Sequence, residues 1–186
     1  MVFLWGGLRH MHASFKTFIA AVDRLNQYAG WFSSLSVLLV TLLATFTACG
    51  RAMGIGSNAL IELQWYLFAL MFLWAAGWTL QHQEHVRVDV LSKHWSPQTR
   101  AWVDIIGHFC VLLPLASLLC WLGAKQALHM YWSGERSADA GGLIRWPVWA
   151  FVPIGFALLI LQTLADLARQ IQIAYSPATS LEQPHD

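Results

Sequence analysis

The sequence predicts an all-α integral membrane protein with four transmembrane helices, preceded by an amphipathic helix at the membrane interface. Of its 186 residues, 57% are hydrophobic and 11% are charged, against about 25% charged in an average soluble domain. The charges are also placed unevenly. Four segments of at least 20 residues contain no Asp, Glu, Lys or Arg: 25–50, 63–83, 105–124 and 146–165. Each is long enough to cross a hydrocarbon core of about 30 Å, which takes about 20 apolar residues in a helix.

A soluble helical bundle is the alternative to a membrane protein. Helices of such a bundle keep a polar face at a spacing of 3.6 residues. Segments 68–76 and 154–161 are apolar on every face, which favours the membrane. No basic stripe suggests nucleic acid as a partner, and the three cysteines have no spacing typical of a disulfide framework or metal site.

The first helical region has two parts. Residues 1–28 are mildly basic, and their apolar side chains recur at spacings of three and four. This pattern predicts an interfacial helix on the cytoplasmic side. The first span, 30–50, carries small and hydroxylated residues at helical spacing, which predict a face for contact with another helix. They are Gly30, Ser34, Val37, Thr41, Thr45 and Ala48.

The remaining spans are predicted at 60–82, 97–131 and 146–170. Ser96 followed by Pro97 is typical of a helix start. At 1.5 Å per residue the third span would be about 50 Å long, so it must tilt or extend beyond the bilayer. The fourth span ends in a polar stripe that comprises Gln162, Asp166, Arg169 and Gln170. The membrane domain is therefore expected at 29–172, with a disordered cytoplasmic tail at 173–186.

Lysine and arginine near the spans set the expected orientation. Seven belong to the side that carries both termini and the link between spans two and three, and four belong to the opposite side. Both termini are therefore expected in the cytoplasm.

Residues for catalysis or cofactor binding are not evident. A b-type haem would require facing histidine pairs on two helices, and His108 is the sole histidine well inside a span. The sequence has no phosphate-binding loop, dinucleotide fingerprint or zinc motif. It also has no charged residue at the middle of a span and no internal duplication, which a transporter core would be expected to show. These observations predict a non-enzymatic accessory subunit without a cofactor or metal.

Several segments carry a resemblance to a known family. They are 62–69 (ELQWYLFA), 85–90 (HVRVDV), 96–104 (SPQTRAWVD), 141–147 (GGLIRWP) and 152–157 (VPIGFA). Together they resemble the small, Q-type membrane subunit of tripartite ATP-independent periplasmic (TRAP) transporters, over about residues 30–172. Ile144 departs from the proline expected before Arg145, which leaves the local shape of that loop open.

The resemblance implies a four-span subunit in the bacterial inner membrane. Its partners would be membrane lipid, a large membrane subunit that holds the substrate and sodium sites, and a periplasmic solute-binding protein. The chain would brace the large subunit and help to dock the binding protein during ion-coupled uptake of an organic acid or related solute. The positions expected to contact partners are Glu62, Gln64, Trp65, Arg87, Asp89, Arg145, Trp146 and Pro147.

Two other functions stay open from the sequence. One is a small redox anchor that binds haem through His82, His108 or His129. The other is a structural membrane protein that associates with copies of itself.

Overall fold

The computed structural model describes residues 2–82, 95–138 and 142–175, and these are almost entirely helical. The helices are α1 (Val2–Ala52), α2 (Asn58–Gln81), α4 (Pro97–Gly107), the π-helix η1 (His108–Leu112), α5 (Leu113–Ser133) and α6 (Trp146–Tyr175). Within the described ranges, the only β pairing is an isolated bridge between Arg136 and Ile144.

Four helical stretches are long and apolar enough to cross a membrane, which confirms the predicted fold class. They are Lys16–Ala52, Asn58–Gln81, Gln98–Ser133 and Trp146–Tyr175. The third stretch joins α4, η1 and α5 without a break. It is about 54 Å long at 1.5 Å per residue, well beyond the roughly 30 Å of a hydrocarbon core.

The expected N-terminal interfacial helix does not occur as a separate element. Residues 2–28 are instead the first part of α1, which continues to Ala52 and is 51 residues long. The junction between the leader and the first span contains one glycine, Gly30, and no proline, and a single glycine is tolerated inside a helix. That residues 1–28 lie in the plane of the membrane interface stays a prediction.

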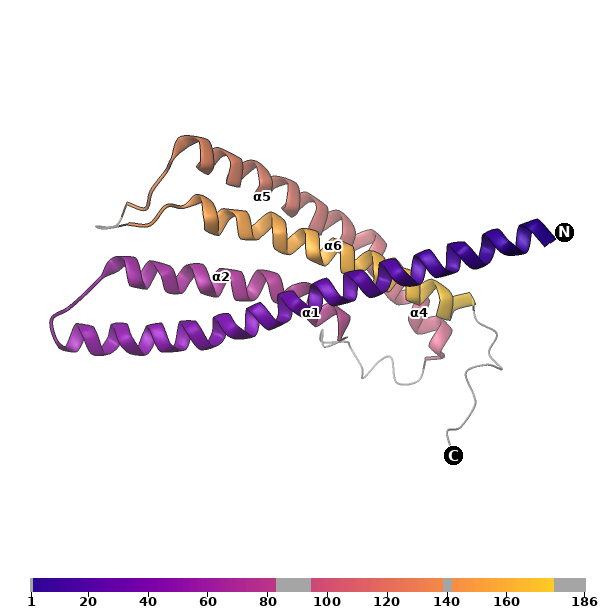
Figure 1. The fold of residues 1–186 in the computed structure, drawn as a ribbon, viewed down its shortest axis with the longest axis horizontal. Coiled ribbons are helices and arrows are strands. Elements are labelled where there is room, and N and C mark those ends of the chain that lie inside the picture. The colour runs from indigo at the N-terminus through magenta and orange to yellow at the C-terminus, as the bar shows by residue number, and fades with distance from the viewer. Residues whose placement is uncertain (1, 83–94, 139–141, 176–186) are drawn as a thin grey trace, which may run out of the picture.

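The helices are arranged around α6 (Figure 1). This helix packs against α5, α2, α4 and α1, and α1 also packs along α2. The links after α1 and after α5 lie at one end of the bundle, which we call the loop end. The start of α1 and the end of α6 lie toward the opposite end, which we call the terminal end (Figure 1).

Small residues allow the helices to approach closely. A Cβ atom added to Gly155 of α6 would lie 2.7 Å from the Leu73 carbonyl oxygen of α2. One added to Gly123 of α5 would lie 2.6 Å from Val152 Cγ1. Because lipid gives little hydrophobic drive for helix association, such close backbone approach supplies packing energy instead.

The packed face of α1 differs from the predicted stripe. Gly30 is buried against Trp78 as expected, but Ser34, Thr41 and Thr45 are exposed. Their hydroxyl groups donate to carbonyl oxygens one turn earlier in the same helix. The buried residues of α1 are Val22, Asn26, Ala29, Gly30, Ser33 and Ser36. The stripe is therefore not the face that α1 uses within this chain, and its use against another subunit stays a prediction.

Candidate functional site

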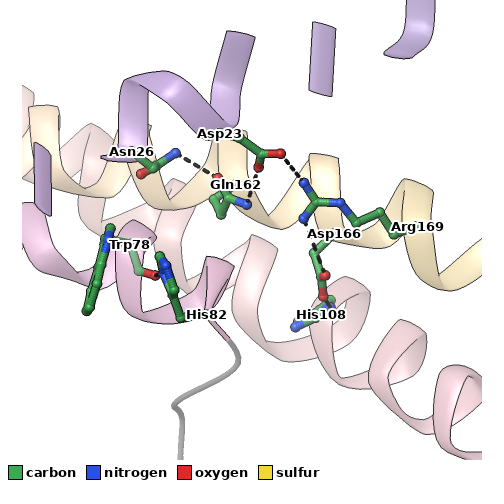
Figure 2. A network of polar contacts seen from close by, with 8 residues as sticks. All are labelled: Asp23, Asn26, Trp78, His82, His108, Gln162, Asp166 and Arg169. Atoms are coloured by element: carbon green, nitrogen blue, oxygen red, sulfur yellow. Dashed lines mark hydrogen bonds and ion pairs between the residues drawn. The ribbon is translucent and has the colours of Figure 1, made fainter. Parts of the chain in front are cut away.

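Six polar side chains meet where α1, η1 and α6 come together (Figure 2). We call them the polar cluster: Asp23, Asn26, His108, Gln162, Asp166 and Arg169. The three members on α6 lie in the second half of that helix, toward the terminal end.

Two amides form the most buried part of this cluster. Asn26 and Gln162 are both 0% exposed. The Asn26 Nδ2 atom donates to Gln162 Oε1 at 2.9 Å and to the Val22 carbonyl oxygen at 3.1 Å. Gln162 Nε2 in turn donates to Asp23 Oδ1 at 3.1 Å. A buried amide without such partners would be costly, so each amide requires the other helix in place.

Charged groups extend the cluster toward the third span. Arg169 donates to Asp23 Oδ2, and its other terminal nitrogen lies 4.0 Å from Asp166 Oδ1. Asp166 is 3% exposed, and its Oδ2 lies 3.6 Å from His108 Nδ1. The Arg169 guanidinium on one side and the His108 ring on the other flank the buried carboxylate, and an unpaired buried charge would be strongly destabilising.

The position of His108 depends on a local widening of its helix. It begins η1, the π-helical turn that ends just before Pro114. Proline has no N–H to donate to the preceding turn, and π-bulges are a common way to accommodate such a missing bond. The histidine noted in the sequence as the one inside a span thus lies beside Asp166 of α6.

A second group of polar contacts, the loop cluster, organises the loop end. Glu62 Oε2 of α2 accepts a hydrogen bond of 2.8 Å from the Leu143 backbone N–H. The Tyr66 hydroxyl donates to the Ile144 carbonyl oxygen at 3.2 Å, and it lies 3.4 Å from Glu62 Oε1. Arg145 pairs with Glu135 at 2.8 Å across the same loop. Helix α2 therefore holds the chain that leads into α6.

The structure brings only some of the predicted contact residues together. Glu62 and Arg145 both border one cavity between α2 and α6, and Trp65 lines it as well. Gln64 points elsewhere, since its Nε2 donates to Thr47 Oγ1 of α1 at 2.9 Å. Trp146 lies against Tyr131 of α5, with ring centroids 5.6 Å apart, and Pro147 is in the first turn of α6. Arg87 and Asp89 lie outside the described residues.

Asp23 and Asn26 are the residues that sequence reasoning missed. Both were assigned to the leader or to the very start of the first span, where a polar residue is ordinary. The sequence does contain a usable signal. Asp23 and Asn26 are three residues apart and so share one face of a helix, and the same holds for Asp166 and Arg169.

Metal or haem binding finds little support among the described residues. They contain no group of three or more His, Cys, Asp and Glu side chains that could hold a metal ion. His82 Nδ1 lies 2.9 Å from the Trp78 carbonyl oxygen of its own helix (Figure 2), and His108 lies beside Asp166.

Comparison with protein families decides the identity of the chain. Residues 40–173 match the model described as tripartite ATP-independent periplasmic transporters, DctQ component. The chain belongs to this family. No curated protein and no solved structure gave a match.

The family identifies the chain as the small permease subunit of a TRAP transporter, a transporter component and not an enzyme. It also implies a large membrane subunit and a periplasmic binding protein as partners. With four helices able to span a bilayer, the chain is a multi-pass protein of the inner membrane.

Proposed function

We propose that this TRAP subunit is a non-catalytic brace that holds the large subunit in place and helps to dock the binding protein. The observation that carries the proposal is the polar cluster, because it ties three of the four spans together at one level. A brace must resist relative movement of its helices. Buried hydrogen bonds between α1 and α6, with His108 of η1 3.6 Å from Asp166, give that resistance.

The loop cluster supports the docking part of the proposal. Glu62 and Tyr66 fix the backbone of Leu143 and Ile144, so the segment before α6 has a defined shape. A preorganised surface binds a partner with less ordering cost than a loose loop does. We propose that this end faces the periplasm, with both termini in the cytoplasm, as the lysine and arginine distribution predicts.

The proposed transport cycle is secondary uptake of an organic acid or related small solute, coupled to sodium. The described spans of this chain offer no cluster of carboxylates for an ion. We therefore assign the ion and substrate sites to the large subunit. Membrane lipid and the large subunit would share the exposed apolar faces of α1 and α5.

Reconstitution tests this function directly. Proteoliposomes that hold both membrane subunits and the binding protein should accumulate solute under an inward sodium gradient, and those lacking either membrane subunit should not. The chain should also co-purify with the large subunit. Sodium-driven uptake by this chain alone would refute the accessory role, and a haem absorption spectrum would favour the redox alternative.

A further inference from the structure

A cavity opens between α2 and α6 toward the loop end of the bundle. Its volume is about 540 Å³, and it is open along one side. Eleven residues line it: Asn58, Ile61, Glu62, Trp65, Tyr66, Ala69, Leu73, Arg145, Val148, Trp149 and Val152. It lies along two membrane-spanning helices, and we call it the α2–α6 groove.

The groove is closed at its deep end by direct contact between the two helices. Leu73 is the deepest lining residue on α2, and its backbone touches the helix at Gly155, where an added Cβ would lie 2.7 Å from the Leu73 oxygen. Toward the loop end the same two helices leave space that the side chains of this chain do not fill. The wall between these limits is mostly apolar.

The depth of the groove matches one leaflet of a bilayer. Below the charged mouth, where Asn58 and Ile61 also line the groove, Leu73 is 11 helical steps beyond Glu62 on α2, which is about 16 Å at 1.5 Å per residue. Half of a hydrocarbon core is about 15 Å. A single acyl chain that enters at the membrane surface would therefore reach the closed end near the bilayer midplane.

The mouth of the groove carries one charge of each sign. Arg145 pairs with Glu135 through one terminal nitrogen, and its side chain remains 45% exposed; a guanidinium has five N–H donors. Glu62 accepts hydrogen bonds from the Leu143 N–H and from Ser137, with the Tyr66 hydroxyl 3.4 Å away, and a carboxylate has about four acceptor positions. Both groups can bind a further partner. Trp65 and Trp149 lie beside them, as aromatic residues do at a membrane surface.

We propose that the α2–α6 groove binds one phosphatidylethanolamine molecule from the leaflet at the loop end. One acyl chain lies along Ile61, Ala69 and Val152, the phosphate accepts hydrogen bonds from Arg145, and the ammonium group donates to Glu62. A zwitterionic headgroup with a primary ammonium satisfies both charges. An anionic lipid such as phosphatidylglycerol would satisfy Arg145 but carries no ammonium group for Glu62. The bound lipid would extend the protein surface at this end, which goes beyond the proposed bracing role.

Native mass spectrometry with a lipid titration tests the proposal. The chain is extracted in a mild detergent with whichever subunit it carries, stripped of lipid, and titrated with phosphatidylethanolamine or phosphatidylglycerol. We expect the tightest single binding event with phosphatidylethanolamine. Val148→Trp, which fills the groove, should abolish that event, whereas Leu38→Trp on an exposed part of α1 should not.

The charged mouth has its own matched pair of variants. Arg145→Gln should weaken phosphatidylethanolamine binding about tenfold, the effect of losing one charge-assisted hydrogen bond. Arg136→Gln removes the same charge from the same loop but not from the groove lining, so it should leave affinity unchanged. Arg145→Gln fills no space in the groove, so it tests the site even if Val148→Trp does not fold.

Three results would overturn the proposal. The first is equal affinity for the two lipids. The second is unchanged lipid binding in Val148→Trp. The third is loss of the large subunit from Val148→Trp with unchanged lipid affinity, which would mean that a partner helix covers the groove. None of these readouts depends on transport activity, so failure here is distinct from failure of the proposed function.

Discussion

The two ends of the helix bundle are held by different kinds of contact. In the terminal half, side chains of α1 and α6 bond to one another, His108 of η1 lies beside Asp166, and the central amides are 0% exposed. At the loop end, Glu62 and Tyr66 of α2 bond to the backbone of a loop, and a cavity of about 540 Å³ remains between the helices. The first arrangement fixes helices against helices. The second fixes a surface loop and leaves room for a ligand.

This difference predicts where the stability of the fold resides. Polar groups in the terminal half are shielded from water, so removing one partner leaves the other unpaired at a cost of about 1–3 kcal/mol. At the loop end the ion pair of Arg145 with Glu135 is 45% and 38% exposed, and pairs of that kind contribute about 0–1 kcal/mol. Substitutions in the polar cluster should therefore act on the whole bundle, and those in the loop cluster should act locally.

The largest effect is expected at the centre of the polar cluster. Gln162→Ala removes the partner of both Asn26 and Asp23 and leaves a cavity. We expect the free energy of unfolding to fall by about 3 kcal/mol, measured by titration with a denaturing detergent. Gln27→Ala, at an exposed position one residue from Asn26, is the control. Equal losses for the two variants would contradict the central role of the cluster.

A smaller effect is expected from the ion pair at the edge of the same cluster. Asp23 and Arg169 have side chains 26% and 32% exposed, so solvent screens them in part. A double-mutant cycle with Asp23→Asn and Arg169→Gln should give a coupling free energy of about 1 kcal/mol that declines at high salt. Additive effects of the two substitutions would show that the pair contributes nothing.

The loop cluster should respond locally. Glu62→Ala removes the acceptor for the Leu143 N–H, so we expect faster amide hydrogen exchange in residues 142–145. The change in unfolding free energy should be about 1 kcal/mol. Glu135→Ala, which breaks only the exposed pair with Arg145, should change exchange less. A loss of stability as large as that of Gln162→Ala would contradict the comparison between the two ends.

The smallest effect on the chain by itself is expected on the exposed stripe of α1. Thr45→Val removes a hydroxyl that bonds only to its own helix, and stability should change by less than about 0.5 kcal/mol. The matched buried variant Ser33→Ala should cost more. If the stripe faces the large subunit, Thr45→Val should lower co-purification of that subunit without destabilising this chain. Unchanged co-purification would remove the stripe from the proposed interface.

The fold was largely predictable, whereas the polar cluster was not. Segments without charge predicted the four spans, because hydrocarbon excludes ionised groups over a defined length. The sequence did not distinguish the face of α1 that packs within this chain, since Ser34, Thr41 and Thr45 are as small and regularly spaced as Ser33 and Ser36. Spacing identifies a face, but two faces with similar residues can be told apart only by the helix that packs on one of them.

The sequence by itself determined that this chain forms four membrane-spanning helices and belongs with a transporter. Composition and local motifs carry that information, because each span must satisfy its own backbone hydrogen bonds in lipid. Only the tertiary structure decided that Asp23 and Asn26 of α1 bond to Gln162 and Arg169 of α6. These residues are more than 130 positions apart, and they meet because α6 lies at the centre of the bundle, where a polar stripe must find partners on its neighbours instead of water.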